Sequence, residues 1–356
     1  MRKNLIYLAI LVFLFPGCED IYTPEIEVVP ARLVVESHIT NDISQNFVHL
    51  SMTRSFYDYS LPENFRGAKV ELLETGGTIL QGIETGDGYF TFTSAPTVGK
   101  KYILRIKHQQ DSYESDPVIM PPLPQIDSLY TKHKIEKSYR TDSYGVPNLV
   151  ETPSREILID APISNQLSYY RFYYRAIIQW TYNPPSFFGP PPPSWYGWKS
   201  VYDIGAFNLA GPKEFSVSDK ISTHPVLSLS YNGNQYLDSV TQLPSGWIVI
   251  LDQYGIQKDS YDFHQQLNSQ FSAEGSLFDP MFTQVYGNIR CTSDPSKIVL
   301  GFFDLNSYRQ YRYFFNNLSK NDKSIIQRQL FTYPEIPVSG YLIGQYPSFW
   351  EFNYAK

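Results

Sequence analysis

The stretch GAKVELLE, residues 67–74, shows the pattern that decides the fold. After the glycine, apolar and charged side chains alternate, and the same alternation returns in KYILRIK at 101–107. Because successive side chains of a β-strand point to opposite faces, this period of two predicts strands with one buried face.

Segments of the same kind surround these two. RLVVESHI, FVHLSMT, GYFTFT and YESDPVIM are separated by the turn sequences ETGG, TGDG and TVGK, in which glycine supplies the positive φ of tight turns. TGDGYF at 85–90 offers a single carboxylate, so a hairpin turn is favoured over a calcium loop. We predict an antiparallel, immunoglobulin-like sandwich over residues 31–122, ended by the stiff MPPLP at 120–124.

Residues 123–356 contain further strand candidates and are predicted to form a larger, mainly β domain. DSYDFHQQLNSQF, 259–271, differs because Phe263, Leu267 and Phe271 are spaced by four and would share one helical face. The fold class expected is therefore mainly β, with one or two helices on the second domain.

The N-terminus has the plan of a bacterial lipoprotein signal. A charged start and an apolar run at 5–15 precede Gly17 and Cys18, which predicts a signal peptide over 1–17 and lipidation of Cys18. A plain secretory signal with an incidental cysteine is the alternative. Acyl chains on Cys18 would give stable membrane anchoring, with residues 18–30 as the tether.

Glu19 and Asp20 directly follow the lipidated cysteine and resemble the export signals of surface lipoproteins. They predict a location on the outer membrane, facing the cell surface. Cys291 is then the one thiol remaining in the mature chain, and we expect it to be buried and inert. The formal charge is −6, and removal of the signal lowers it to −8, which argues against nucleic acid as a partner.

The sequence contains few motifs typical of catalysis or metal binding. The six histidines are scattered singly: His38, His49, His108, His133, His224 and His264. No nucleophile elbow, phosphate loop or dinucleotide fingerprint occurs, so we expect no catalytic residues, no metal and no cofactor. An enzyme stays open as an alternative, because carboxylate pairs of hydrolases can be far apart in sequence.

The stretch WTYNPPSFFGPPPPSWYGWKSVYD, 180–203, is the candidate contact site. Four consecutive prolines favour a stiff polyproline II segment in a loop at 183–198. The aromatic residues around it could stack on a ligand or dock into a partner: Trp180, Phe187, Phe188, Trp195, Tyr196 and Trp198. Alternatively, these rings fold back onto the core of their own domain.

LVVESHITND, GAKVELLETGG, GDGYFTF and YESDPVIMPPLPQIDSLY occur in that order, followed by LFDPMFTQVYGNIRCTSDPSKIVLGFFD. In this the chain resembles a Bacteroidota outer-membrane lipoprotein family catalogued as a domain of unknown function. The resemblance implies a first module similar to the immunoglobulin-like regulatory domain of carboxypeptidases, and genes beside TonB-dependent receptors. It suggests a non-catalytic accessory or binding subunit of such a receptor in nutrient uptake. The alternative is a structural or assembly subunit of an outer-membrane complex.

Overall fold

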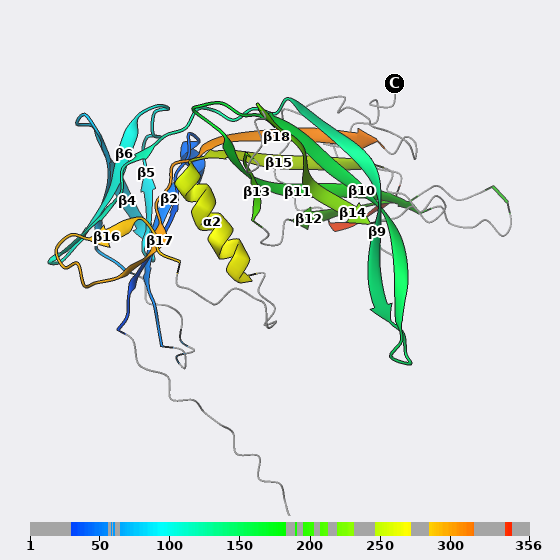
Figure 1. The fold of residues 1–356 in the computed structure, drawn as a ribbon, viewed down its shortest axis with the longest axis horizontal. Coiled ribbons are helices and arrows are strands. Elements are labelled where there is room, and N and C mark those ends of the chain that lie inside the picture. The colour runs from blue at the N-terminus through cyan, green and yellow to red at the C-terminus, as the bar shows by residue number, and fades with distance from the viewer. Residues whose placement is uncertain are drawn as a thin grey trace, which may run out of the picture.

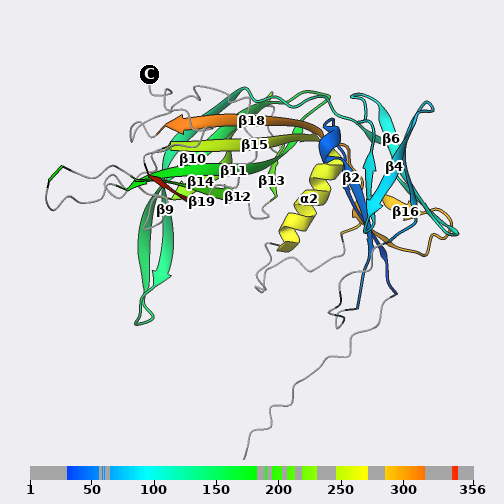
Figure 2. The same ribbon diagram turned by 180° about the vertical axis from the view of Figure 1, so that it is seen from behind.

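The fold is mainly β, as the alternating sequence predicts. The computed structural model describes residues 30–55, 58, 60, 65–182, 189–190, 195–202, 207–212, 219–230, 246–271, 285–316 and 339–343. These residues form one sheet around the N-terminal strands and two further sheets beside it, with a helix between the two parts (Figures 1 and 2).

The first sheet has ten strands. They are β1 (Leu33–His38), β2 (Phe47–Met52), β3 (Lys69–Glu74), β4 (Ile79–Gly86), β5 (Tyr89–Phe92), β6 (Lys101–His108), β7 (Asp111–Ser115), β8 (Val118–Ile119), β16 (Ile289–Cys291) and β17 (Val299–Phe302). A short 3₁₀ turn, η1 (Ile43–Gln45), links β1 to β2. The strand order is β16-β7-β6-β3-β4-β5-β2-β1-β17, and β8 pairs with β6.

The apolar positions of the alternating sequence are the buried positions of the strands. Val70 and Leu72 of β3 and Leu104 and Ile106 of β6 are completely buried. Burial of each such side chain contributes about 1.5–3 kcal/mol. Cys291 of β16 is buried in the same core, as predicted.

The last two strands of this sheet come from the far end of the chain. β17 runs parallel to β1, with Leu33 opposite Val299, while β16 pairs with β7 at the other end of the strand order. The two ends approach each other, because the Asn288 side chain both donates to and accepts from the backbone of Phe303, at 2.8 Å. The sheet is therefore nearly closed, and residues 289–302 belong to it although they lie beyond the predicted boundary at 122.

The second part consists of two sheets that face each other. One holds β9 (Ser128–Thr141), β10 (Pro147–Pro162) and β14 (Lys220–Ser230), in the order β14-β10-β9. The other holds β11 (Tyr169–Tyr182), β12 (Trp195–Tyr202), β13 (Asn208–Ala210), β15 (Gly246–Ile256), β18 (Ser307–Asn316) and β19 (Ser339–Ile343). Ile157 and Ile159 of the first pack with Phe172 and Val249 of the second in one buried cluster.

The proline-rich connection between the two parts is packed in place. Met120 is fully buried, and Ser307 Oγ donates to the Pro122 carbonyl at 2.6 Å. Gln253 Nε2 donates to the Gln125 carbonyl at 3.0 Å. The connecting segment at the predicted boundary, 120–124, is thus held against strands β15 and β18 by hydrogen bonds.

The predicted helix is present as α2 (Lys258–Phe271), which lies beside both parts (Figures 1 and 2). Phe263 stacks on Phe302 of the first sheet with ring centroids 4.7 Å apart. Phe271, predicted on the same helical face, is 77% exposed because it belongs to the last turn, away from that sheet. Among the described residues, no helix has both the length and the apolar character to cross a membrane.

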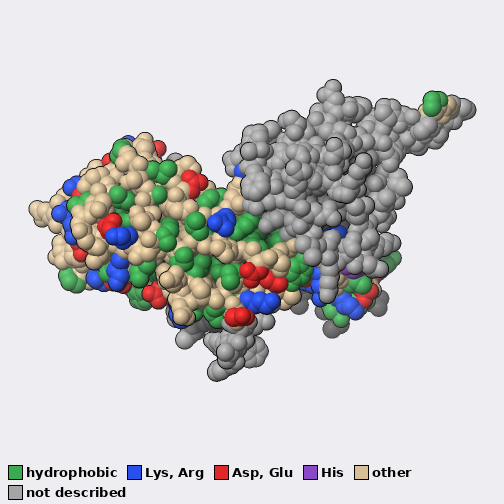
Figure 3. Space-filling model, turned by 90° about the horizontal axis from the view of Figure 1, so that it is seen from above, with side chains coloured by type: hydrophobic (Ala, Val, Ile, Leu, Met, Phe, Trp, Pro, Cys, Tyr) green, Lys and Arg blue, Asp and Glu red, His purple; other side chains and the backbone are tan. Residues whose placement is uncertain are grey.

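Charges of both signs are mixed on one face of the molecule. On the face shown in Figure 3, basic and acidic side chains are interspersed over the described part instead of gathering by sign. Ion pairs such as Lys69–Glu71, at 2.6 Å, and Lys100–Glu74, at 3.1 Å, reflect this arrangement.

Candidate functional site

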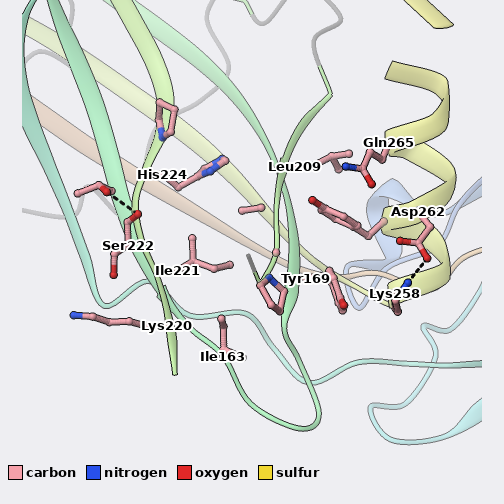
Figure 4. Close-up of a pocket in the computed structure, with 16 residues that line it drawn as sticks. Ile163, Tyr169, Leu209, Lys220, Ile221, Ser222, His224, Lys258, Asp262 and Gln265 are labelled. Carbon is pink, nitrogen blue, oxygen red and sulfur yellow. Dashed lines mark hydrogen bonds and ion pairs between the residues drawn. The ribbon is translucent and has the colours of Figure 1, made fainter. Parts of the chain in front are cut away.

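A cleft of about 740 Å³ lies between helix α2 and strands β13 and β14 (Figure 4). Its volume is typical of small-molecule sites. The helix contributes Lys258, Tyr261, Asp262 and Gln265 to one wall, and residues 220–225 of β14 form the opposite wall.

Two tyrosines from different elements form the aromatic part of the lining. Tyr169 begins β11 and Tyr261 lies on α2, and their ring centroids are 4.9 Å apart at an interplanar angle of 45°. Gly211 allows this approach, because a Cβ there would lie only 2.8 Å from the Tyr169 ring. Burial and the neighbouring Tyr169 raise the pKa of Tyr261, so its phenol stays protonated.

His224 contributes a defined polar group. Asn208 donates through Nδ2 to the carbonyls of Pro225 and Val226, at 3.0 and 3.3 Å, which fixes the orientation of its amide. Its Oδ1 therefore accepts from His224 Nε2 at 2.6 Å. Burial lowers the pKa of His224 to about 4. The ring is neutral at pH 7, with the proton on Nε2 and Nδ1 as its acceptor.

Backbone strain accompanies these groups on β14. Thr223 has φ of +54°, which is a rare conformation for a β-branched residue. Its N–H donates to Asp160 Oδ1 at 2.7 Å, and the β10–β14 register is irregular between Ile159 and Ala161. Strained residues and bulges concentrate at functional sites. Here they set the path of the chain from Ser222 to His224 along the cleft.

The charged groups of the cleft belong to the helix and to the start of β14. Lys258 and Asp262 form an ion pair one turn apart, and the hydrogen bond from Lys258 to Asp262 raises the pKa of the lysine. Lys220 lies across the cleft on β14 (Figure 4). The lining thus combines aromatic surface, two cations, one carboxylate and neutral hydrogen-bonding groups.

A buried ionic cluster holds α2, and with it one wall of the cleft, against both parts of the molecule. Ser260 Oγ donates to Asp304 Oδ2 at 2.7 Å, just after β17. Arg171 Nη1 of β11 lies 2.6 Å from His264 Nε2. Since a guanidinium only donates, His264 Nε2 is the acceptor in that contact. The guanidinium also lies 5.2 Å from the ring centroid of Tyr254, a favourable cation–π arrangement.

The predicted contact residues that the structure describes do not line the cleft. Trp180 is in β11, and Trp195, Tyr196 and Trp198 are in β12, with Tyr182 paired to Trp195. The last four residues of the predicted loop at 183–198 are therefore strand. Phe187, Phe188, Cys18, Glu19 and Asp20 lie outside the described residues.

Sequence reasoning missed the residues of the cleft. Tyr169, Tyr261 and His224 each occur in a segment with an ordinary strand or helix pattern. One signal was available: His224 is followed by Pro225 inside a strand, and proline in a strand marks an edge or a bulge.

Family membership follows from the sequence as a whole, not from the cleft. Searches among curated proteins and among solved structures returned no match. One family profile covers the chain from just behind Cys18 into strand β18, and so includes both faces of the cleft and helix α2. The chain belongs to the family described as "Domain of unknown function (DUF4249)", whose profile matches residues 19–312.

Proposed function

We propose that this protein is a non-catalytic binding subunit of a TonB-dependent receptor, anchored in the outer membrane through lipidated Cys18. In this role it captures a small hydrophilic nutrient, such as a short glycan or peptide, and passes it to the receptor. The observation that carries the proposal is the cleft between α2 and β14.

The chemistry of the cleft supports binding of a neutral or weakly charged polar ligand. The rings of Tyr169 and Tyr261 offer apolar surface, and aromatic rings with a polar tip suit ligands that are partly apolar and partly hydrated. Neutral His224 and Gln265 offer donors and acceptors. Among the described lining residues the one carboxylate, Asp262, is engaged with Lys258, which favours recognition over the paired carboxylates of glycoside hydrolysis.

The location is supported by the N-terminal sequence. The apolar run at 5–15 followed by Gly17 and Cys18 suits a lipoprotein signal, and Glu19 with Asp20 suits export to the cell surface. The resemblance to Bacteroidota outer-membrane lipoproteins supports a TonB-dependent receptor as the partner. It also supports an immunoglobulin-like character for the first module, whose antiparallel strands surround one core.

The binding test uses the mature chain and calorimetric titration with oligosaccharide and peptide mixtures. Tyr261→Ala removes half of the aromatic lining, and we expect it to weaken binding at least about tenfold, since one buried aromatic face contributes on the order of 1–3 kcal/mol. Tyr144→Ala, on a turn far from the cleft, is the matched control and should bind as the unaltered protein does. Equal binding by the Tyr261 variant would exclude the cleft as the ligand site.

Capture of partners from mildly solubilised outer membranes tests the receptor. Recovery of one TonB-dependent receptor in stoichiometric amount supports uptake. If assembly components are recovered instead, and Tyr261→Ala does not change their recovery, the protein is a structural subunit of an outer-membrane complex.

A further inference from the structure

The hairpin formed by β9 and β10 extends away from the rest of the molecule (Figures 1 and 2). β9 is the outer strand of its sheet within the described residues. On the other side β14 pairs with β10 only from Ser154 to Pro162. The outer half, residues 132–151, which we call the arm, therefore has neither a facing sheet nor a neighbouring strand in the described part of the chain.

The arm exposes large apolar side chains. Tyr139 is 75% exposed and Leu149, directly opposite it in the register, is 51% exposed. Ile135, four residues before Tyr139 on the same face of β9, is 52% exposed. Beyond them, Tyr144 at the turn is 90% exposed and Val146 is 53% exposed. The ion pair of Lys137 with Glu151, at 2.9 Å, separates Ile135 from the other four residues, which occupy the outer end of the arm. Exposed apolar side chains gathered in this way mark an interaction surface.

The turn at the end of the arm is ordered so that it presents these residues. Asp142 Oδ1 accepts from the backbone N–H groups of Tyr144 and Val146, both at 2.9 Å. Asp142 Oδ2 accepts from Asn148 Nδ2 at 3.1 Å. These hydrogen bonds from the Val146 and Tyr144 backbone lower the pKa of Asp142, so the carboxylate that holds the turn is ionised at neutral pH.

The charge of the arm differs from that of the whole chain. Residues 132–151 carry four cations, Lys132, Lys134, Lys137 and Arg140, against three anions, although the chain has a formal charge of −6. Two of the cations form ion pairs within the hairpin, Lys134 with Glu156 at 3.1 Å and Lys137 with Glu151 at 2.9 Å. Lys132, Lys134 and Arg140 occupy even-numbered positions of β9, so they lie on the face opposite to Ile135 and Tyr139. Aromatic rings beside lysine and arginine are typical of the interface between a bilayer and water, and each cation near an anionic surface contributes about 1 kcal/mol.

The position of the arm agrees with this chemistry. The first described residues, at the dark-blue start of the ribbon, leave the first sheet on the side of the molecule toward which the arm points (Figures 1 and 2). Under the proposed function, the chain that precedes them runs to the lipid on Cys18. The anchor and the arm would then meet one and the same bilayer.

We propose that the arm is a second membrane contact: Tyr144 and Val146 enter the interface, Tyr139 and Leu149 cover the headgroups, and Lys132 and Arg140 bind anionic lipid. The choice of the membrane-facing side rests on the proposed anchoring. With two contacts the protein would be held at a fixed orientation instead of rotating about a single tether.

The test removes the lipid and asks whether the arm binds a bilayer unaided. The mature chain with Cys18→Ser is sedimented with vesicles of phosphatidylethanolamine and phosphatidylglycerol. We expect binding that weakens as salt rises, and a loss of at least about tenfold in the partition coefficient for the triple variant Tyr139→Ser, Tyr144→Ser, Leu149→Ser. Ile79→Ser with Ile83→Ser on β4, which are 46% and 52% exposed, is the matched control and should bind normally.

Three results would overturn the proposal. They are no binding by the unlipidated chain, equal binding by the triple variant, and equal loss in the control. If vesicles are not bound but the triple variant no longer captures a protein from solubilised membranes, the arm is a protein-docking surface. Because the chain used has no acyl group and an intact cleft, these results are independent of lipidation and of ligand binding.

Discussion

Replacing Asp304 by asparagine should destabilise the junction between the two parts of the molecule. Asp304 is 5% exposed and accepts from Ser260 at 2.7 Å. Burial would raise the pKa of Asp304, but the Arg171 cation and the hydrogen bonds to the carboxylate outweigh burial and lower the pKa from 3.8 to about 2. Asparagine retains an oxygen for Ser260 and removes only the charge.

The magnitude follows from that pKa. One pKa unit corresponds to about 1.4 kcal/mol, so the ionised carboxylate adds about 2 kcal/mol to the free energy of unfolding at pH 7. Since the folded pKa is the lower one, this contribution is complete above the unfolded value of 3.8 and is lost as the pH falls through about 2. The difference between variant and unaltered protein should shrink over the same interval.

Urea unfolding followed by fluorescence, at pH 7 and at several values below pH 4, checks this expectation. Asp116→Asn is the control, because its exposed ion pair with Arg290 contributes about 0–1 kcal/mol. A variant as stable as the unaltered protein at pH 7 would refute the assignment of Asp304 as the charge that compensates Arg171. A deficit that persists unchanged at low pH would show that packing, not charge, is lost.

Other predictions concern the closure of the first sheet, the thiol and the cleft. Gly301→Ala would place a Cβ 1.9 Å from the Val35 carbonyl oxygen at φ of +101°, and Gly287→Ala would place a Cβ 1.6 Å from the Gly301 carbonyl oxygen. Each substitution should prevent soluble expression or lower the free energy of unfolding by at least about 3 kcal/mol. Buried Cys291 should react with a maleimide only after denaturation, as mass spectrometry would show. Burial lowers the pKa of His224 from 6.5 to about 4, so the free energy of unfolding should decrease as the pH drops through that interval. In urea unfolding at several pH values, His224→Gln should abolish this pH dependence of stability.

Local sequence pattern predicted the elements well, and their partners less well. Alternation in residues 101–107 predicted β6, and the spacing of Phe263 and Leu267 predicted α2. The return of β17 to pair with β1 was not predicted, because a period of two specifies which face of a strand is buried and not which strand lies beside it. Asn288, whose amide links the two ends of the first sheet, is similarly inconspicuous in sequence.

The cleft could not be predicted for a related reason. Attention to aromatic density singled out residues 180–203, whereas the aromatic lining of the cleft comes from Tyr169 and Tyr261, far apart in the chain and brought together where Gly211 leaves room for their rings. The strained backbone at Thr223 depends on Asp160 of the neighbouring strand, a contact that no local pattern encodes. The site forms only where a helix, a bulged strand and a glycine come together in the tertiary structure. Within its own segment, each lining residue fits an ordinary helix or strand pattern and gives no sign of a binding site.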